Sequence, residues 1–142
     1  MKLAALFVLT SLVLSSCANK VSIAPTPVGQ WIPIGENNDS DVISVDTINF
    51  VNNEDGSKVW VRVDHKKPPT PGRNSTEFYA SFNCREGTFR TYQEVHLGNM
   101  GEKLQDQPVN MQPTKVRDAS TESLVLNKVC FDKKAPKNES QS

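Results

Sequence analysis

Residues 58–64 read Lys-Val-Trp-Val-Arg-Val-Asp, and this stretch decides the fold. Valine occupies every second position, which is the period of a β-strand, so Val59, Val61 and Val63 share one face. Trp60 lies on the opposite face. Because a tryptophan opposes the valines, we expect both faces of this strand to be covered by other parts of the chain.

Further strands are predicted on both sides of this stretch. The segments with strand-like composition are 31–34, 42–46 with a continuation through 48–51, 77–84 and 88–97. Residues 52–56 end in Asp-Gly, which is typical of a hairpin turn, and Gly87 marks a second antiparallel hairpin. A short strand is also predicted around 109–111, within a polar region.

The last element is predicted to be a helix of roughly 12 residues, which would be marginal without tertiary contacts. Residues 118–120 (Asp-Ala-Ser) offer side chains that cap a helix N-terminus, and Glu122 suits the positive end of the helix dipole. Leu126, Val129 and Cys130 fall on one side of such a helix. Strands followed by one helix make the fold class α+β.

The N-terminus resembles the signal sequence of a bacterial lipoprotein. A basic start is followed by an apolar run over 3–14, which is too short to span a bilayer, where about 20 residues are needed. Residues 14–17 read Leu-Ser-Ser-Cys and are similar to a lipobox, in which Cys17 is the lipidation site. The alternative is an ordinary secretory signal with a chance cysteine. In the lipoprotein pattern, Ala18 favours the outer membrane over the inner membrane.

This resemblance divides the chain into four parts. They are a lipoprotein signal peptide (1–16), a lipidated N-terminus with a flexible tether (17–30), a folded domain (31–132) and a disordered tail (133–142). Pro25 and Pro27 favour an extended tether. Several acyl chains such as palmitate on Cys17 would make membrane attachment effectively permanent, so the membrane is the first expected partner.

The three cysteines are consistent with this layout. If Cys17 carries lipid, Cys84 and Cys130 remain as one pair, and outside the cytoplasm a disulfide is the expected state. Such a bond closes a loop of about 47 residues and stabilises the fold by about 4 kcal/mol in the chain-entropy model. Two cysteines without a histidine cluster make no zinc site, and no Cys-x-x-Cys redox motif is present.

Composition argues against several function classes. Residues 1–16 contribute only the charge of Lys2, so the mature chain has 15 basic and 16 acidic residues and a formal charge of −1. A near-neutral domain is not expected to bind nucleic acid. No phosphate loop, Gly-x-Ser-x-Gly or His-Glu-x-x-His motif occurs. The aspartates at 39, 41, 46, 55 and 64 are spread over separate segments and do not form a calcium loop.

Two features retain a functional interpretation beside a structural one. Glu94 and His96 lie two residues apart on one strand face, which suits a metal ligand pair or a general base, but also an ordinary exposed face. His65 is interpreted as a surface histidine. It precedes the basic, proline-rich segment 66–73, which is either a solvated connection or a contact loop for a polyanion or a host protein.

The order of these features resembles the bacterial surface-adhesin protein E family. The resemblance covers roughly 31–131 and rests on Trp31, Ser-Val-Asp-Thr-Ile at 44–48, Lys-Val-Trp-Val-Arg at 58–62, Asn-Cys at 83–84 and Val-Cys at 129–130. It implies one antiparallel sheet of about six strands, with a C-terminal helix tied to one face by a disulfide. It also implies an outer-membrane lipoprotein that binds host proteins, although no ligand-contacting motif can be matched to positions here.

Three functions are compatible with the sequence. The first is a non-enzymatic outer-membrane lipoprotein whose domain binds host extracellular or cell-surface proteins. The second is a periplasm-facing envelope lipoprotein that acts as a structural or accessory module for another envelope protein. The third is a small hydrolase, for which the sequence offers little beyond Glu94 and His96. A homodimer through the sheet is left open, and no cofactor is expected.

Overall fold

The computed structural model describes residues 24–53 and 56–131. The elements in chain order are β1 (Trp31–Glu36), β2 (Val42–Asp46), β3 (Val51–Asn53), β4 (Gly56–Asp64), β5 (Ser75–Asn83), β6 (Thr88–Leu97), β7 (Lys103–Pro108), β8 (Thr114–Lys115) and α1 (Thr121–Phe131). The predicted signal peptide (1–16), Cys17 and the predicted tail (133–142) lie outside the described residues.

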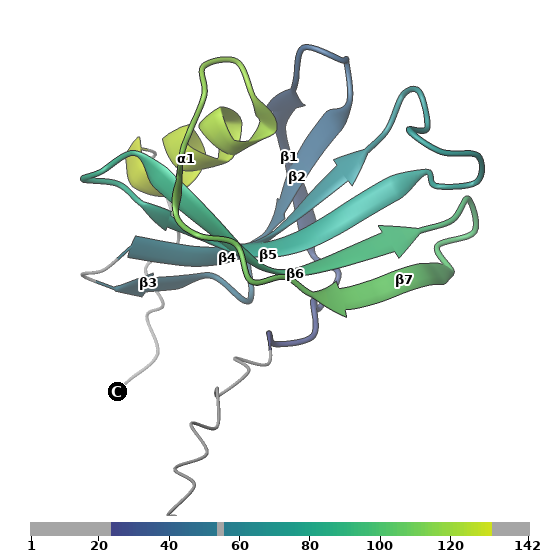
Figure 1. Ribbon diagram of the computed structural model, residues 1–142, viewed down its shortest axis with the longest axis horizontal. Coiled ribbons are helices and arrows are strands. Elements are labelled where there is room, and N and C mark those ends of the chain that lie inside the picture. Colours follow the sequence, from purple (N-terminus) through teal and green to yellow (C-terminus); the bar gives the residue numbers. More distant parts are fainter. Residues whose placement is uncertain (1–23, 54–55, 132–142) are drawn as a thin grey trace, which may run out of the picture.

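All strands belong to one antiparallel sheet, with α1 placed against it (Figure 1). The main path of the sheet is β1-β2-β4-β5-β6-β7, while β3 pairs with the start of β4 and β8 pairs with the start of β6. The prediction of a single antiparallel sheet with a C-terminal helix is therefore confirmed. The two short strands bring the total to eight, where about six were predicted.

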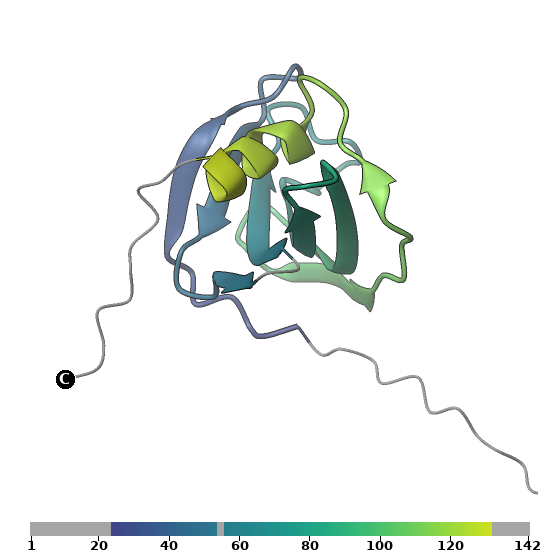
Figure 2. The same cartoon turned by 90° about the vertical axis from the view of Figure 1, so that its left-hand side faces the viewer.

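The valines of β4 face α1 and form the main core. Val59 and Val61 are fully buried, and they stand opposite Ala80 and Phe78 of β5 in the strand register. Val125 of α1 is also fully buried in this cluster. Figure 2 shows α1 lying across this side of the sheet. Burial of this apolar face explains why an 11-residue helix is stable here.

The opposite face of the sheet carries a second, smaller apolar cluster. Trp60 is 1% exposed and packs with Tyr79, Val95, Leu97 and Ala24. The prediction that both faces of the central strand are covered is confirmed. Ala24 belongs to residues 24–30, which we call the N-terminal strap because they run over this face into β1.

The N-terminal strap is bonded to the domain. Trp60 Nε1 donates a hydrogen bond to the carbonyl oxygen of Pro25 at 2.5 Å, and the backbone N–H of Val28 donates to Asp46 Oδ2 at 3.0 Å. Asn49 Nδ2 donates to the carbonyl oxygen of Thr26 at 3.1 Å. The described part of the predicted tether is therefore joined to the folded domain, which begins before the predicted boundary at residue 31.

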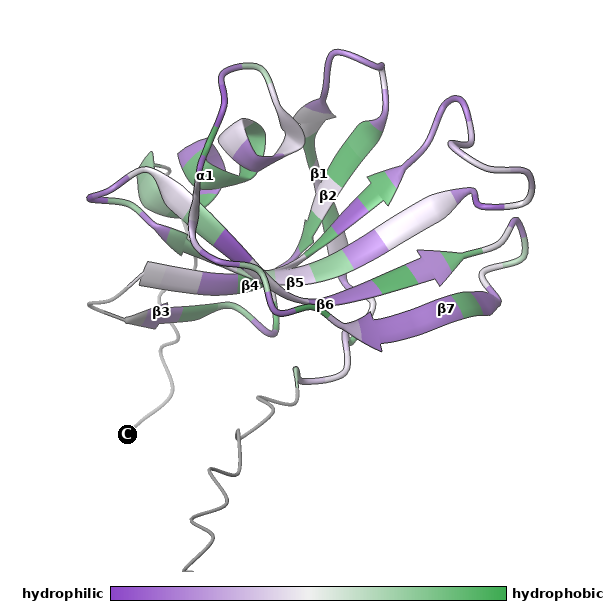
Figure 3. Ribbon diagram, in the orientation of Figure 1, coloured by the Kyte–Doolittle hydropathy of each residue, from purple (hydrophilic) through white to green (hydrophobic). Residues whose placement is uncertain are grey.

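Strand placement between β6 and α1 differs from the prediction. The expected strand around 109–111 is not formed; β7 precedes it and β8 follows it. Val109 N–H donates to the Tyr92 carbonyl at 2.8 Å, and the chain then leaves the sheet. Every residue of β7 is exposed, and Figure 3 shows this edge strand as largely hydrophilic. An edge strand whose side chains are all exposed needs no apolar alternation, so its sequence carries no strand signal.

The helix begins at Thr121, just after the predicted capping segment. Ser120 is the residue that caps it, because its Oγ accepts a hydrogen bond from the Ser123 N–H at 3.2 Å. The turn before it places Ala119 at φ 58°, a left-handed conformation that is uncommon for a residue with a side chain.

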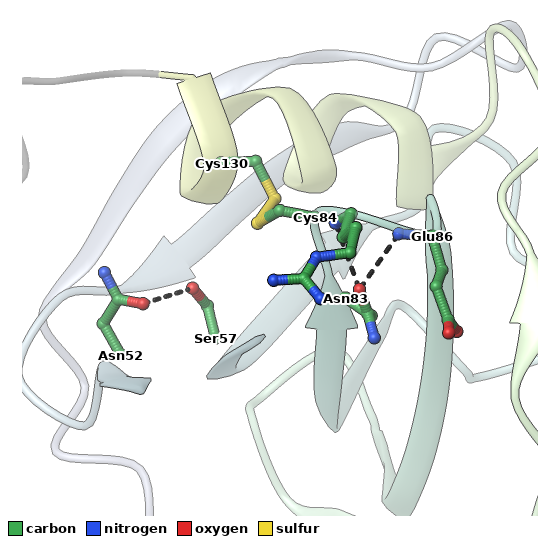
Figure 4. Close-up of a disulfide and its surroundings, with 7 residues drawn as sticks. Asn52, Ser57, Asn83, Cys84, Glu86 and Cys130 are labelled. Atoms are coloured by element: carbon green, nitrogen blue, oxygen red, sulfur yellow. Dashed lines mark hydrogen bonds between the residues drawn. A yellow bond between two sulfur atoms is a disulfide. The ribbon is translucent and has the colours of Figure 1, made fainter. Parts of the chain in front are cut away.

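A disulfide joins the last turn of α1 to the turn that follows β5. Cys84 and Cys130 are bonded with an S–S distance of 2.00 Å and a Cα–Cα distance of 5.5 Å, as predicted. Figure 4 shows this bond beneath the helix, beside the turn in which Asn83 Oδ1 accepts the Arg85 and Glu86 N–H groups. The bond fixes the C-terminal end of the helix to the far end of β5.

Candidate functional site

Three hairpin loops and the start of α1 gather at one end of the sheet, which we call the loop end (Figure 1). The loops connect β1 to β2 (37–41), β4 to β5 (65–74) and β6 to β7 (98–102). Asn37 Nδ2 donates a hydrogen bond to Thr121 Oγ1 at 3.2 Å, so the first loop is tied to the helix. Loops held by a rigid sheet in this way are common sites of binding.

The β4–β5 loop is the most exposed of the sequence-predicted features. Residues 66–72 (Lys-Lys-Pro-Pro-Thr-Pro-Gly) are exposed at every position and carry two lysines and no acidic residue. One backbone hydrogen bond closes the loop at its base, from His65 N–H to the Asn74 carbonyl at 2.9 Å. A second joins this base to the end of β6, from Asn74 N–H to the Leu97 carbonyl at 2.9 Å. The loop therefore presents a basic, proline-rich tip on a fixed base.

The entrance to this loop is held by Asp41. Its Oδ2 lies 3.0 Å from His65 Nδ1, and its Oδ1 accepts the Lys66 N–H at 2.9 Å. Burial alone would raise the pKa of the Asp41 carboxyl, but these hydrogen bonds and the nearby His65 outweigh burial and lower the pKa below its ordinary value. The carboxylate is thus kept charged, which strengthens its hold on the loop.

The exit from the loop is held by Arg73. Its Nη2 donates to Thr76 Oγ1 at 2.9 Å and lies 3.4 Å from Glu94 Oε1. The same Glu94 oxygen lies 2.5 Å from His96 Nε2. The predicted pairing of Glu94 with His96 is therefore present, but Glu94 also binds the loop arginine. Across the described ranges, no group of three or more metal-ligating side chains gathers.

The interpretation of His65 as a surface histidine is wrong. Its side chain is 13% exposed, and both ring nitrogens have partners: Nδ1 lies by Asp41, and Nε2 lies 2.8 Å from Thr76 Oγ1. A carboxylate can only accept a hydrogen bond, so Nδ1 carries a proton in its contact with Asp41. Two loops and one strand thereby meet at a single imidazole ring.

The order Asp41, His65 and Thr76 is that of a catalytic acid–histidine–hydroxyl triad. The Thr76 hydroxyl oxygen, however, accepts hydrogen bonds from both Nε and Nη2 of Arg73. Thr76 is also only 6% exposed. A nucleophile has to reach substrate, whereas this hydroxyl is surrounded by its structural partners. The arrangement therefore serves to fix the loop in position.

Clefts lie on both sides of the β1–β2 loop. One, of about 350 Å³, separates the loop from the start of α1. The other, of about 480 Å³, lies between this loop and the β4–β5 loop, and its lining includes His65, Lys67 and Pro69. Ser40, in the loop between the two clefts, has φ 61°. A residue held in this strained region is frequent at functional sites.

Sequence reasoning found the loop but not the residues that hold it. Asp41 is 24 positions from His65, and Arg73 is 21 positions from Glu94, so no local motif joins them. Thr76 had no distinguishing signal either. The pairing of β2 with β4 brings Asp41 to His65, and the pairing of β5 with β6 brings Arg73 and Thr76 to Glu94.

Comparison with known proteins identifies the family. Within the described part of the chain, no helix is long and apolar enough to cross a membrane. No curated protein and no solved structure matches the chain significantly. The family model for surface-adhesin protein E matches residues 31–131, which cover β1 through the end of α1. The chain therefore belongs to the surface-adhesin protein E family.

Proposed function

We propose that this chain is a non-enzymatic, lipid-anchored adhesin of the bacterial outer membrane, and that its β4–β5 loop contacts host extracellular or cell-surface proteins. Membership in the family supports a surface adhesin with an envelope or cell-surface location. The lipobox-like sequence at 14–17 supports an anchor at Cys17, and Ala18 supports the outer membrane.

The observation that carries the proposal is the rigid presentation of residues 66–72. Seven consecutive exposed residues are held at both ends by Asp41 and Arg73. Three prolines further limit the conformations of this tip. A loop that is already ordered loses little conformational entropy when it binds, so more of the free energy of its contacts contributes to affinity. Lys66 and Lys67 suit an acidic stretch on the partner.

A second candidate is a periplasm-facing envelope lipoprotein that serves as an accessory module. The observation that favours it is β7, an edge strand with all six residues exposed. Its free backbone groups would accept an added strand from another envelope protein, or from a second copy of this chain. The two candidates differ in the side of the outer membrane on which the domain lies.

Protease treatment of intact cells that carry the full-length chain separates them. We expect added protease to remove the domain from intact cells, and a periplasmic marker protein to survive in the same sample. Protection of the domain in intact cells, together with cleavage after the outer membrane is opened, would favour the accessory module.

Binding of intact cells to immobilised host extracellular matrix tests the loop. We expect the double variant K66A/K67A to lower binding several-fold, with the loss greatest at low salt. Arg85→Ala is the matched control, because Arg85 is exposed at the opposite end of the sheet. Equal binding by wild type, K66A/K67A and R85A, at equal surface amounts, would exclude the loop as the contact.

A further inference from the structure

Three aromatic rings form a row across the face of the sheet opposite α1. The ring centroids of Trp60 and Tyr79 are 5.4 Å apart, and those of Tyr79 and Tyr92 are 6.2 Å apart. The N-terminal strap covers the Trp60 end through Ala24 and Pro25. The Tyr92 end is half-buried and has a different environment.

Two cations converge on Tyr92. Lys58 Nζ lies 5.4 Å from the ring centroid, and Arg90 Cζ lies 5.2 Å from it. The strand register explains this, because Lys58 stands opposite Ser81 and Ser81 stands opposite Arg90. We call Lys58, Arg90 and Tyr92 the basic aromatic cluster.

Neither Lys58 nor Arg90 forms an ion pair with any residue of 24–53 or 56–131. Arg62 and Lys103 form ion pairs with Asp64 and Asp106, whereas neither cation of the cluster does so. Arg90 Nη2 donates to the neutral Asn110, while its buried Nε atom has no hydrogen-bond partner. Two positive charges beside one tyrosine ring suit an anionic group such as a phosphate.

Two exposed apolar side chains lie in the strap and in the chain segment bonded to it. Val28 is 57% exposed and Ile48 is 50% exposed, and both backbone N–H groups donate to the carboxylate of Asp46. Val28 precedes β1 and Ile48 follows β2, and both of these strand ends lie at the end of the sheet opposite the loop end. Lys58 is likewise near the start of β4, about 20 Å along the strand from its loop-end residue Asp64.

The length of chain between the strap and Cys17 limits how far this face can lie from a membrane. Six residues, 18–23, separate Cys17 from Ala24. The corresponding seven steps between Cα atoms span at most about 25 Å in an extended chain. Because Ala24 is packed against Trp60, a lipid on Cys17 would hold the face opposite α1 close to the headgroups.

We propose that this face docks on the bilayer that holds the anchor. Lys58 and Arg90 contact headgroup phosphates, Tyr92 lies at the interface, and Val28 and Ile48 reach the apolar boundary. The proposal rests on the proposed lipid at Cys17. Residues 66–72 lie at the opposite end of the sheet from Val28, Ile48 and Lys58, outside the docked contact.

Lysine footprinting of the full lipidated chain in vesicles tests the proposal. An amine-reactive acylating reagent is applied in phosphatidylglycerol-rich vesicles, in phosphatidylcholine vesicles and in detergent, and each lysine is quantified by mass spectrometry. We expect Lys58 modification to fall several-fold in the anionic vesicles only, and to recover at high salt. Lys67, at the loop end, should react equally in all three. Inorganic phosphate added in detergent should not protect Lys58.

The variant Arg90→Gln should restore much of the Lys58 reactivity in anionic vesicles, whereas Arg85→Gln should not. Equal reactivity of Lys58 in all three samples, with lipid present on the N-terminal peptide, would overturn docking and leave the proposed anchor intact. Protection of Lys58 in detergent would also overturn it, because the chain itself would then cover the cluster. An N-terminal peptide without lipid would overturn the anchor and, with it, the docking.

Discussion

The carboxylate of Asp46 is fully buried beneath the N-terminal strap, and its Oδ2 accepts the backbone N–H of Val28 at 3.0 Å. The same carboxylate accepts the Ile48 N–H at 2.9 Å and Asn49 Nδ2 at 3.0 Å. Three donors from two segments therefore meet one buried acceptor. Asp46 thus joins the strap to the chain that follows β2.

Replacement of this carboxylate should loosen the strap. In Asp46→Asn, one acceptor oxygen becomes an NH₂ group that faces N–H donors, so at least one buried donor loses its partner. We expect the free energy of unfolding to fall by about 1–3 kcal/mol, measured by urea denaturation. Asp39→Asn, at an exposed position, is the control and should remain within about 0.5 kcal/mol of wild type. Equal stability of both variants would contradict the assigned role.

Loss of the disulfide should release the end of α1. The bond joins residues 46 positions apart, and the chain-entropy model gives about 4 kcal/mol for a loop of this size. We expect C84S/C130S to lower the free energy of unfolding by about this amount in guanidinium denaturation. Reduced wild type serves as the comparison and should unfold at the same denaturant concentration as the variant. A large difference between the two would show that the substitutions act in another way.

Gly56 should not tolerate a side chain. Its φ is 130°, and an added Cβ would overlap the carbonyl oxygen of Phe82 on β5. We expect Gly56→Ala to lower stability by more than about 2 kcal/mol, because backbone strain and a clash combine. Gly72→Ala is the matched control: its φ is 83° but no atom lies within 4 Å of the added carbon, so a cost of about 1 kcal/mol is expected. Comparison of the thermal unfolding of both variants separates the cost of the clash, present only at Gly56, from the cost of backbone strain, present at both positions.

The buried acids predict opposite responses to pH. The pKa of Asp41 is lowered from its ordinary value of 3.8, so its stabilising effect is complete above that value and is lost as pH falls through the folded pKa. The stability difference between wild type and Asp41→Asn, from urea midpoints, should therefore shrink in acid. Burial raises the pKa of Glu77 above 4.5. Wild type should thus lose stability relative to Glu77→Gln as pH rises through the raised pKa of Glu77. If neither variant's stability difference from wild type changes with pH, the roles assigned to Asp41 and Glu77 are both contradicted.

The central strands could be predicted because both of their faces are buried against other parts of the chain. Valines at alternate positions of 58–64 indicated the strand, and Trp60 indicated a second covered face. The hairpin about Gly87 was equally clear, since its φ of 61° suits glycine and its N–H closes the turn onto the Asn83 carbonyl. Burial imposes a pattern on the sequence, and such patterns can be recognised without a structure.

The elements that escaped prediction are those that bury little or act over long distances. The polar edge strand β7 buries no side chain, so no apolar pattern is imposed on its sequence. The strap has no apolar period, and only its contacts with Trp60 and Asp46 show that it is ordered. At the loop end, the composition of 66–73 indicated a contact loop, but the bond between Asp41 and His65 depends on strand pairing.

The position of α1 at the end of the described chain has a consequence for the timing of folding. Val125 completes a core whose valines were synthesised some sixty residues earlier, and the disulfide needs Cys130. Until α1 has been synthesised and has folded, the apolar face of the sheet on which it packs is uncovered. A chain that stops short of residue 121 would therefore leave this apolar face uncovered, a state that favours aggregation and proteolysis.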